Sequence, residues 1–174
     1  GMGYVCSNKI SATRSLADWN VLQESGARFK NETNVGAALP ILHGLRSMLE
    51  TGDRIKRIEA VLSGSVNYIF SSMDGGQNFS NAVRSAGQKG YTEPDARIDL
   101  SGMDVARKIL ILARMCGAEV TMEDVQVKGF LPEAAFAGDL NGFVAQLDAL
   151  GTAMDAQAAE ATAAGKRLRF VASY

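Results

Sequence analysis

The sequence predicts an α+β fold, in which a mixed or antiparallel β-sheet is covered by helices, and three observations support it. Several long stretches repeat their apolar positions at helical spacing, whereas residues 54–62, 125–130 and 167–174 read as short strands. Neither G-x-G-x-x-G after a strand nor G-x-x-x-x-G-K-[ST] occurs, so no nucleotide-binding half of a doubly wound fold is expected. The 174 residues are enough for a sizeable core.

Local patterns place each element. Ser11 is a candidate N-cap, Pro40 suits the first turn of a helix, and Gly90 suits the end of one. In chain order we expect a helix over 11–29, a loop over 31–39, a helix over 40–52, a strand over 54–62, helices over 66–75 and 78–89, a loop over 90–102, a helix over 103–115, a strand over 125–130, helices over 140–150 and 152–164, and a strand over 167–174.

The charge balance excludes two classes of partner. The 18 Lys and Arg against 19 Asp and Glu give a net charge of -1, which leaves no basic excess for nucleic acid or an anionic membrane. No apolar run reaches the roughly 18 residues of a membrane span and no export signal opens the chain, so a cytoplasmic protein is expected. Cys6 and Cys116 lie outside any C-x-x-C pair, and we expect reduced thiols.

Both ends of the sequence have features that are typical of a truncated protein. Gly1 precedes Met2 and has the character of a scar left by a cleaved tag. The final strand, 167–174, stops before any turn residues close it. We therefore expect residues 1–174 to be a piece of a longer protein, truncated at both ends.

The acids of the loop and the next helix are the main candidates for chemistry. Asp104 and Lys108 share one face of a helix that is otherwise largely apolar and should be buried. Burying an acid and an ammonium is costly unless the two are paired or used. The loop would bring Glu93 and Asp99 to the start of the same helix. Carboxylates that grip an amine, beside a lysine acting as general acid or base, suit a small zwitterionic substrate.

Other roles explain some of the same residues. Ser101-x-x-Asp104 can be a capping box and Asp104 to Lys108 an i, i+4 pair, which together stabilise a helix by about 1 to 2 kcal/mol. The acids can instead hold a divalent metal, although they lack the regular D-x-D-x-D spacing of a calcium loop. Residues 34–40 fit either a ligand-approach loop or a tight turn, and Lys9 alone reads as a solvated surface lysine.

The motif GYTEPDARIDLSGMDVARK, residues 90–108, resembles homoserine dehydrogenase. Further motifs extend the resemblance over almost the whole chain, closest to the form fused behind aspartokinase: SNK at 7–9, NVGAALP at 34–40, LSGS at 62–65 and LRFV at 168–171. The resemblance implies the substrate-binding and dimerisation domain of an enzyme that reduces L-aspartate 4-semialdehyde to L-homoserine with NADPH or NADH, in threonine, methionine and isoleucine biosynthesis. It implies a homodimer or larger homo-oligomer, with most of the Rossmann domain outside this chain.

The resemblance also implies roles for single residues. Lys108 would be the catalytic acid/base at the aldehyde oxygen, and Lys9, also catalytic, would lie between nicotinamide and substrate. Gly90 would approach the cofactor. The substrate-binding residues would be Glu93 and Asp104 on the amino group, with Asp99, Tyr91 and Ser65 in the same pocket.

A monovalent cation, Na⁺ or K⁺, is implied as well. Family members bind it through positions that match the carboxylate of Glu32 and the backbone carbonyls of Val35, Ala37 and Leu39. One carboxylate with several carbonyls suits a weakly held hard cation better than zinc.

Three positions depart from the family pattern. Ser65 stands where many relatives have threonine, while Ala96 and Ile98 replace a proline and an aspartate of the P-D-P-R-D-D run. These changes affect loop rigidity and one charge rather than the implied ligands. We expect the chain alone to be inactive, because it cannot hold the cofactor by itself. The alternatives are a non-catalytic dimerisation or regulatory domain and, more remotely, a metal-dependent hydrolase or lyase.

Overall fold

The computed structural model describes residues 2–25 and 28–174, and the chain divides into two compact units. The first unit takes Gly1–Leu62, Val105–Gln126 and Ala172–Tyr174. The second takes Ser63–Asp104 and Val127–Val171. Each unit is therefore assembled from segments that are distant in sequence.

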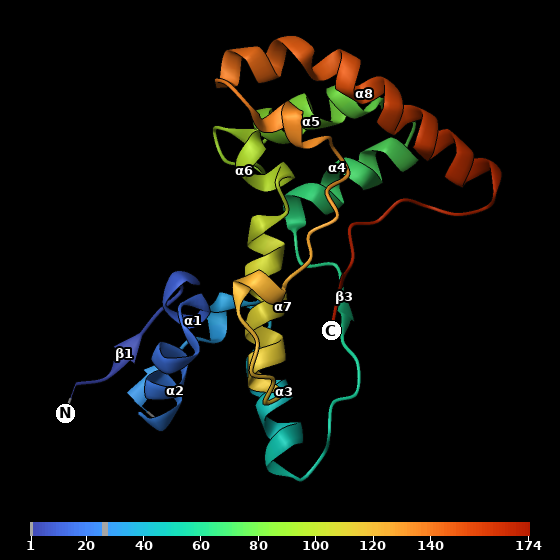
Figure 1. Ribbon diagram of the computed structural model, residues 1–174. Helices are drawn as coiled ribbons and strands as arrows, with labels where there is room; N and C mark the ends of the chain where they lie inside the picture. The colour runs from blue at the N-terminus through green and yellow to red at the C-terminus, as the bar shows by residue number, and fades with distance from the viewer. Residues whose placement is uncertain (1, 26–27) are drawn as a thin grey trace. The chain divides into compact units, whose positions relative to one another are not determined.

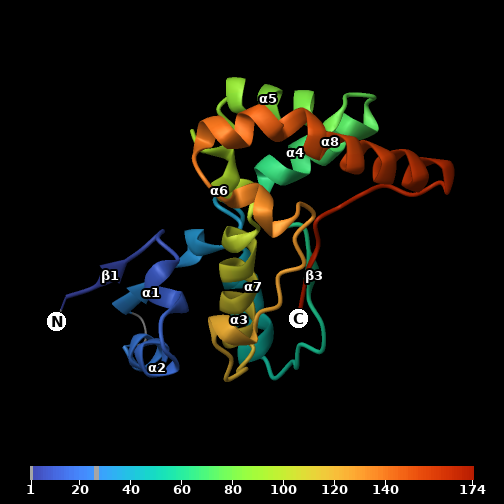
Figure 2. The ribbon, with the colours of Figure 1, turned by 45° about the horizontal axis from the view of Figure 1, so that its top comes forward.

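The first unit contains two short sheets. β1 (Tyr4–Val5) pairs in parallel with β2 (Phe29–Lys30), and the rings of Tyr4 and Phe29 stack with centroids 5.7 Å apart. β3 (Glu59–Ala60) pairs antiparallel with β4 (Ala172–Ser173), so the C-terminus lies beside β3 in both Figure 1 and Figure 2. The helical elements of this unit are α1 (Ile10–Thr13), α2 (Leu16–Glu24), η2 (Glu32–Asn34), α3 (Ile41–Glu50), most of α7 (Met103–Met115) and η3 (Met122–Asp124).

A buried arginine joins distant segments of the first unit. Arg114, in the last turn of α7, is 2% exposed. Its Nε donates to the carbonyl oxygen of Val120 at 2.8 Å, and its Nη1 donates to that of Ala12 at 3.0 Å. Burial lowers the pKa of Arg114, yet the guanidinium stays charged at neutral pH because its ordinary pKa is so high. The two carbonyls therefore stabilise a buried positive charge.

Three helices form the core of the second unit. α4 (Gly64–Asp74), α5 (Phe79–Gln88) and α8 (Leu140–Ala163) pack against one another, and Figures 1 and 2 both show α8 running along α5 and α4. Burying one Leu or Phe side chain stabilises a fold by about 1.5 to 3 kcal/mol. The core residues of these helices include Val66, Ile69, Phe70, Phe79, Ala82, Phe143, Leu147 and Met154.

Side-chain caps fix where the three helices start. Ser63 accepts a hydrogen bond from the backbone N–H of Val66, and Asn78 and Asp139 cap α5 and α8 in the same way. Such a cap contributes about 1 kcal/mol because it satisfies an N–H that the helix leaves without a partner. The remaining helical elements of the unit are α6 (Ala96–Leu100) and η4 (Glu133–Phe136).

The predicted α+β class is confirmed, and the helices expected over 40–52, 66–75, 78–89 and 103–115 form as α3, α4, α5 and α7. The two helices expected over 140–150 and 152–164 are one continuous helix, α8. Gly151 is not a stop between them. A Cβ there would lie 3.4 Å from the backbone nitrogen of Ser80, so this glycine lets α5 approach α8 closely.

The predicted helix over 11–29 was wrong in its extent. α1 ends at Thr13, and Ser15 starts α2 by accepting a hydrogen bond from the N–H of Asp18 at 3.1 Å. Phe29 belongs to β2 rather than to a helix. The loop expected over 90–102 contains the short helix α6.

The predicted strands were too long. Only Glu59–Ala60 of 54–62 and Ala172–Ser173 of 167–174 are strand, and the described structure of 125–130 contains none. The apolar residues alternate in these segments because their side chains pack against other side chains, although most of the backbone does not pair with another strand. Phe130, for example, contacts Phe70 edge-on at 5.3 Å between centroids. Within residues 2–25 and 28–174, every helix is too short or too polar to cross a membrane.

Candidate functional site

Asp99 connects the acid-rich loop to the start of α4. Its Oδ1 accepts a hydrogen bond of 2.7 Å from the Ser65 hydroxyl, and its Oδ2 accepts one of 2.8 Å from the backbone N–H of Glu93. Ser65 is 8% exposed, and its hydroxyl lies 3.0 Å from that of Ser63, the N-cap of α4. The structure therefore brings together Ser65, Glu93 and Asp99, three of the residues predicted to bind substrate.

The loop begins at a left-handed glycine. Gly90 has φ +70°, and its N–H donates to the carbonyl of Gly87 at 3.0 Å. The N–H of Tyr91 donates to the carbonyl of Ala86 at 2.9 Å, so the loop turns back directly from the end of α5. Apart from Gly90 and its two chain neighbours, no atom of the described residues lies within 4 Å of where a Cβ of Gly90 would stand, which leaves the backbone there open to a ligand.

Arg97 holds the other end of the loop. Asp95 caps α6 by accepting the N–H of Arg97 at 3.0 Å, and the Arg97 guanidinium grips both oxygens of the same carboxylate at 2.6 to 3.1 Å. Its Nη1 also donates to the carbonyl of Gly138 at 2.8 Å. The Arg97 guanidinium lowers the pKa of Asp95, and Asp95 raises that of Arg97. Asp95 is thus a structural acid.

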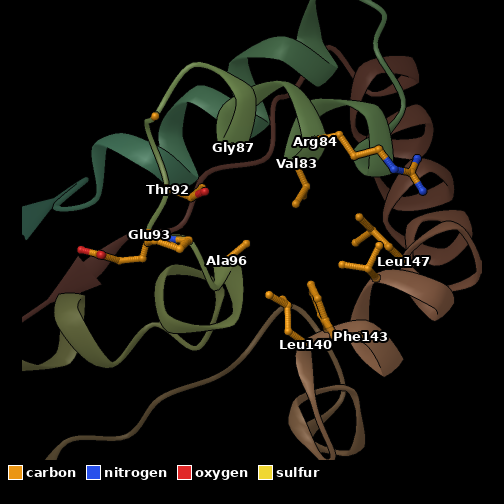
Figure 3. Close-up of a pocket in the computed structure, with 12 residues that line it drawn as sticks. Val83, Arg84, Gly87, Thr92, Glu93, Ala96, Leu140, Phe143 and Leu147 are labelled. Atoms are coloured by element: carbon orange, nitrogen blue, oxygen red, sulfur yellow. The ribbon is translucent and has the colours of Figure 1, made fainter.

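A half-open cavity of about 390 Å³ lies on another side of this loop. Figure 3 shows Val83, Phe143 and Leu147 pointing into it, while the carboxylate of Glu93 is directed away. An amine-binding carboxylate must face its ligand, so this mainly apolar cavity is not where Glu93 would grip a substrate. The residues that line it are Val83, Arg84, Gly87, Gly90, Thr92, Glu93, Pro94, Ala96, Leu140, Phe143, Val144 and Leu147.

Lys108 is half-buried in α7, within the first unit. Its Nζ donates a hydrogen bond of 2.7 Å to the carbonyl of Leu62, the residue that directly precedes Ser63-Gly64-Ser65. Asp104 lies one turn earlier in α7 and is also half-buried. Lys9, likewise half-buried, stands at the N-terminus of α1.

Ser101, the first residue of the predicted capping box, lies between α6 and α7. It is the C-cap of α6, and its hydroxyl donates to the carbonyl of Ile98 at 2.8 Å. The same hydroxyl accepts from the N–H of Met103 at 3.3 Å. Ser101 therefore closes α6 and opens α7.

The candidate cation loop follows β2 in the first unit. Oε1 of Glu32 accepts a hydrogen bond of 3.0 Å from the N–H of His43 in the first turn of α3. Gly36 and Ala37 have φ +87° and +49°, so the chain turns sharply between the carbonyls of Val35 and Leu39. The carboxylate of Glu32 and the carbonyls of Val35, Ala37 and Leu39 thus belong to one short loop, and oxygen donors of this kind suit a hard monovalent cation.

A divalent metal would need a cluster of His, Cys, Asp or Glu side chains. Among the residues that the structure describes, no three His, Cys, Asp or Glu side chains are grouped so as to hold a metal ion. Both cysteines, Cys6 and Cys116, are free thiols. The metal-site interpretation of the acids in 93–104 therefore has no ligand cluster to support it.

Tyr68 is the site residue that sequence reasoning missed. It lies in α4, and its ring packs edge-on against the ring of Tyr91, with centroids 4.8 Å apart. Nothing in the sequence separates Tyr68 from an ordinary half-buried helical tyrosine. Only the fold shows that it lies beside the acid-rich loop.

A family model described as homoserine dehydrogenase matches residues 40–174. The chain belongs to the homoserine dehydrogenase family. It is 43% identical over 176 residues to a bifunctional aspartokinase/homoserine dehydrogenase of Haemophilus influenzae, a match that covers 98% of this chain and 22% of that relative.

Solved structures agree with this family. A Candida auris protein of unknown function is 35% identical, with a TM-score of 0.88 over 97% of this chain and 50% of its own. A hyperthermophilic archaeal homoserine dehydrogenase in complex with NADPH is 30% identical, with a TM-score of 0.59 over 70% of this chain and 40% of its own. The chain therefore spans half or less of the length of these three relatives.

Proposed function

We propose that this chain is the substrate-binding part of a homoserine dehydrogenase, which interconverts L-aspartate 4-semialdehyde and L-homoserine. The observation that carries the proposal is the Ser65–Asp99–Glu93 arrangement, in which Asp99 fixes the backbone of Glu93 beside the start of α4. Glu93 is exposed, so its carboxylate is available to the amino group of a substrate, with Asp104 as the second acid. Family membership supports this assignment.

Lys108 would move the proton. In reduction its ammonium would give a proton to the aldehyde oxygen while a hydride adds to the aldehyde carbon, which becomes the CH₂ of the alcohol, and Lys108 would be left as a neutral amine. In oxidation that amine takes the proton from the homoserine hydroxyl. The hydrogen bond from Nζ to the Leu62 carbonyl supports this role, because it fixes where the ammonium stands.

A nicotinamide cofactor, NADPH or NADH, would supply the hydride. This chain would contribute the open backbone at Gly90 and the ammonium of Lys9, while most cofactor contacts would come from residues outside it. A solved relative named as an NADPH complex supports NADPH. Because the cofactor site would be incomplete, the 174-residue chain alone would bind substrate without turning it over.

We also propose a Na⁺ or K⁺ site at Glu32 and the carbonyls of Val35, Ala37 and Leu39. Equal ionic strengths of KCl, NaCl and N-methylglucamine chloride would separate specific binding from screening. The expected result is a higher Tm in KCl or NaCl, lost in Glu32→Gln. Equal Tm values in the three salts would exclude the site.

The function is tested by ligand-observed NMR of L-homoserine with the whole chain. Wild type is expected to bind, whereas Glu93→Ala and Asp104→Ala, each checked for fold by circular dichroism, are expected to lose binding. Glu123→Ala, on an exposed acid of η3, is the matched control and should bind as wild type does.

The alternative is a non-catalytic dimerisation or regulatory domain. It predicts self-association in analytical ultracentrifugation with no response to L-homoserine. If the folded wild-type chain does not bind L-homoserine, this alternative is favoured and a preformed substrate pocket is not supported. The substrate-binding function itself is compatible with a homodimer, which the same sedimentation run would detect.

A further inference from the structure

The ring of Tyr68 is held from two directions by the residues that flank Gly90. The Nζ of Lys89 lies 5.0 Å from the centroid of the Tyr68 ring, within the range of a cation–π contact. The Tyr91 ring meets the same ring edge-on, at 4.8 Å and an interplanar angle of 71°. Gly90, between them, has φ +70°. One side chain of α4 thus contacts both sides of the turn that starts the substrate loop.

The hydroxyl of Tyr68 adds a third attachment, to α5. It lies 3.0 Å from the hydroxyl of Ser85. Hydrogen bonds from Lys89 first, then from Ser85 and Ser72, lower the pKa of Tyr68 to about 8, and the contact with Tyr68 raises the pKa of Lys89. These shifts agree in direction, because both favour a phenolate beside an ammonium.

The turn at Gly90 needs such support. Two backbone hydrogen bonds, from Gly90 to Gly87 and from Tyr91 to Ala86, form the turn, but they leave the side chains of residues 91–93 to be oriented by their neighbours. Asp99 fixes the far end of this stretch through the N–H of Glu93. Tyr68 is the corresponding anchor at the near end, where its ring packs against the ring of Tyr91, a residue that is 54% exposed.

We infer that Tyr68 is a positioning residue that holds the Gly90 turn, so that Tyr91 and Glu93 face the substrate. The inference rests on the proposed homoserine-binding function. It assigns Tyr68 no contact with the substrate and no part in proton transfer. Its ring is the essential part, because the ring makes both contacts that flank the turn.

Two substitutions distinguish the contribution of the Tyr68 ring from that of its hydroxyl. Tyr68→Phe keeps the ring, and Tyr68→Leu removes it; Tyr4→Leu, in the first unit, is the matched control for losing an aromatic pair. For Tyr68→Leu we expect L-homoserine binding to weaken about tenfold or more, the scale of a lost aromatic pair. Tyr68→Phe should stay within about threefold of wild type, as should Tyr4→Leu.

A second readout does not depend on the proposed function. The ring protons of Tyr91 should carry a ring-current shift from Tyr68, which persists in Tyr68→Phe and disappears in Tyr68→Leu. Persistence of the shift in folded Tyr68→Leu, or homoserine binding within about twofold of wild type, would overturn the inference. If wild type fails to bind L-homoserine while the shift behaves as expected, the proposed function fails and the anchoring of the turn stands.

Lys89→Met is a second test of the same contact, to be used if the Tyr68→Leu variant does not fold. Spectrophotometric titration of the phenol in wild type should show a group with a pKa of about 8, and the groups that face it are Lys89, Ser85, Ser72 and Tyr91. In Lys89→Met this midpoint should rise toward the ordinary value of 10.0, and L-homoserine should bind more weakly. An unmoved midpoint together with unchanged binding would contradict the role given to the turn.

Discussion

Ser65 and Asp99 lie 34 positions apart in the sequence, and the serine hydroxyl donates a 2.7 Å hydrogen bond to the aspartate. The second oxygen of the same carboxylate accepts the N–H of Glu93 at 2.8 Å. A carboxylate suits this position because both of its oxygens accept. One side chain therefore ties the substrate loop to the helix that starts beside it.

Asp99→Asn should destabilise the fold. The amide keeps only one acceptor oxygen, so it can accept from Glu93 only if its NH₂ group donates to the Ser65 hydroxyl, which must then reorient from donor to acceptor. We expect the free energy of unfolding to fall by about 1 kcal/mol. Urea denaturation followed by circular dichroism measures this change. Asp53→Asn, on an exposed acid, should change it by less than about 0.5 kcal/mol, and equal effects of the two variants would refute the linking role of Asp99.

Lys108→Ala, in a longer chain that also binds the nicotinamide cofactor, should reduce turnover about 100-fold or more, the scale of a lost general acid. Steady-state oxidation of L-homoserine, followed by reduced-cofactor absorbance, measures the effect. Lys128→Ala removes an exposed lysine and is the control. Turnover within about threefold of wild type would take Lys108 out of the proton-transfer role.

Arg97→Gln should change the acid sensitivity of the fold. The Arg97 guanidinium lowers the pKa of Asp95 below the ordinary 3.8. The resulting stability is present above the unfolded pKa and is lost as the pH falls through the folded pKa. Between about pH 5 and pH 2, wild type should lose more unfolding free energy than Arg97→Gln does. Parallel urea curves test this, with Arg54→Gln as control; identical losses in wild type and Arg97→Gln would exclude the effect.

Gly102→Ala should be among the more damaging glycine substitutions. Gly102 has φ +74°, and a Cβ there would lie 2.8 Å from Cζ of Phe170 and 3.3 Å from Cγ1 of Val127. Backbone strain and overpacking together should cost about 2 to 4 kcal/mol. Gly44→Ala, inside α3 with nothing within 4 Å of the new Cβ, should instead raise stability by about 0.5 to 1 kcal/mol. Tm values from thermal melts compare the two.

Helices were predictable where local signals agreed. The helices expected over 66–75 and 78–89 lie within two residues of the bounds of α4 and α5, and the structure adds the caps Ser63 and Asn78. The strands were not predictable, because alternation at residues such as Phe130 and Phe170 arises from packing of aromatic rings rather than from sheet pairing. Periodicity records which side of a chain is buried, not whether its backbone finds a partner strand.

The site was predictable in its residue types but not in its geometry. The acids at 93, 99 and 104 could be selected from the sequence, since so many charges beside an apolar helix are unusual. The sequence does not show which partner each acid binds, because this depends on how the loop folds around α6. In the structure Asp99 accepts a hydrogen bond from the backbone N–H of Glu93, and Asp95 pairs with Arg97. Tyr68 could not be selected, because its importance comes from contacts with residues distant in sequence.

The buried guanidinium of Arg114 sets a limit on how far this chain can be shortened. One of its two carbonyl acceptors, that of Ala12, comes from the first turns of the chain, a separation of 102 positions. A shorter version that begins after Ala12 would leave a positive charge in the interior with one fewer acceptor and an open path for water. Designers of minimal versions should therefore keep Ala12 and the peptide bond that carries its carbonyl, or replace Arg114 at the same time with an apolar side chain of similar length such as methionine.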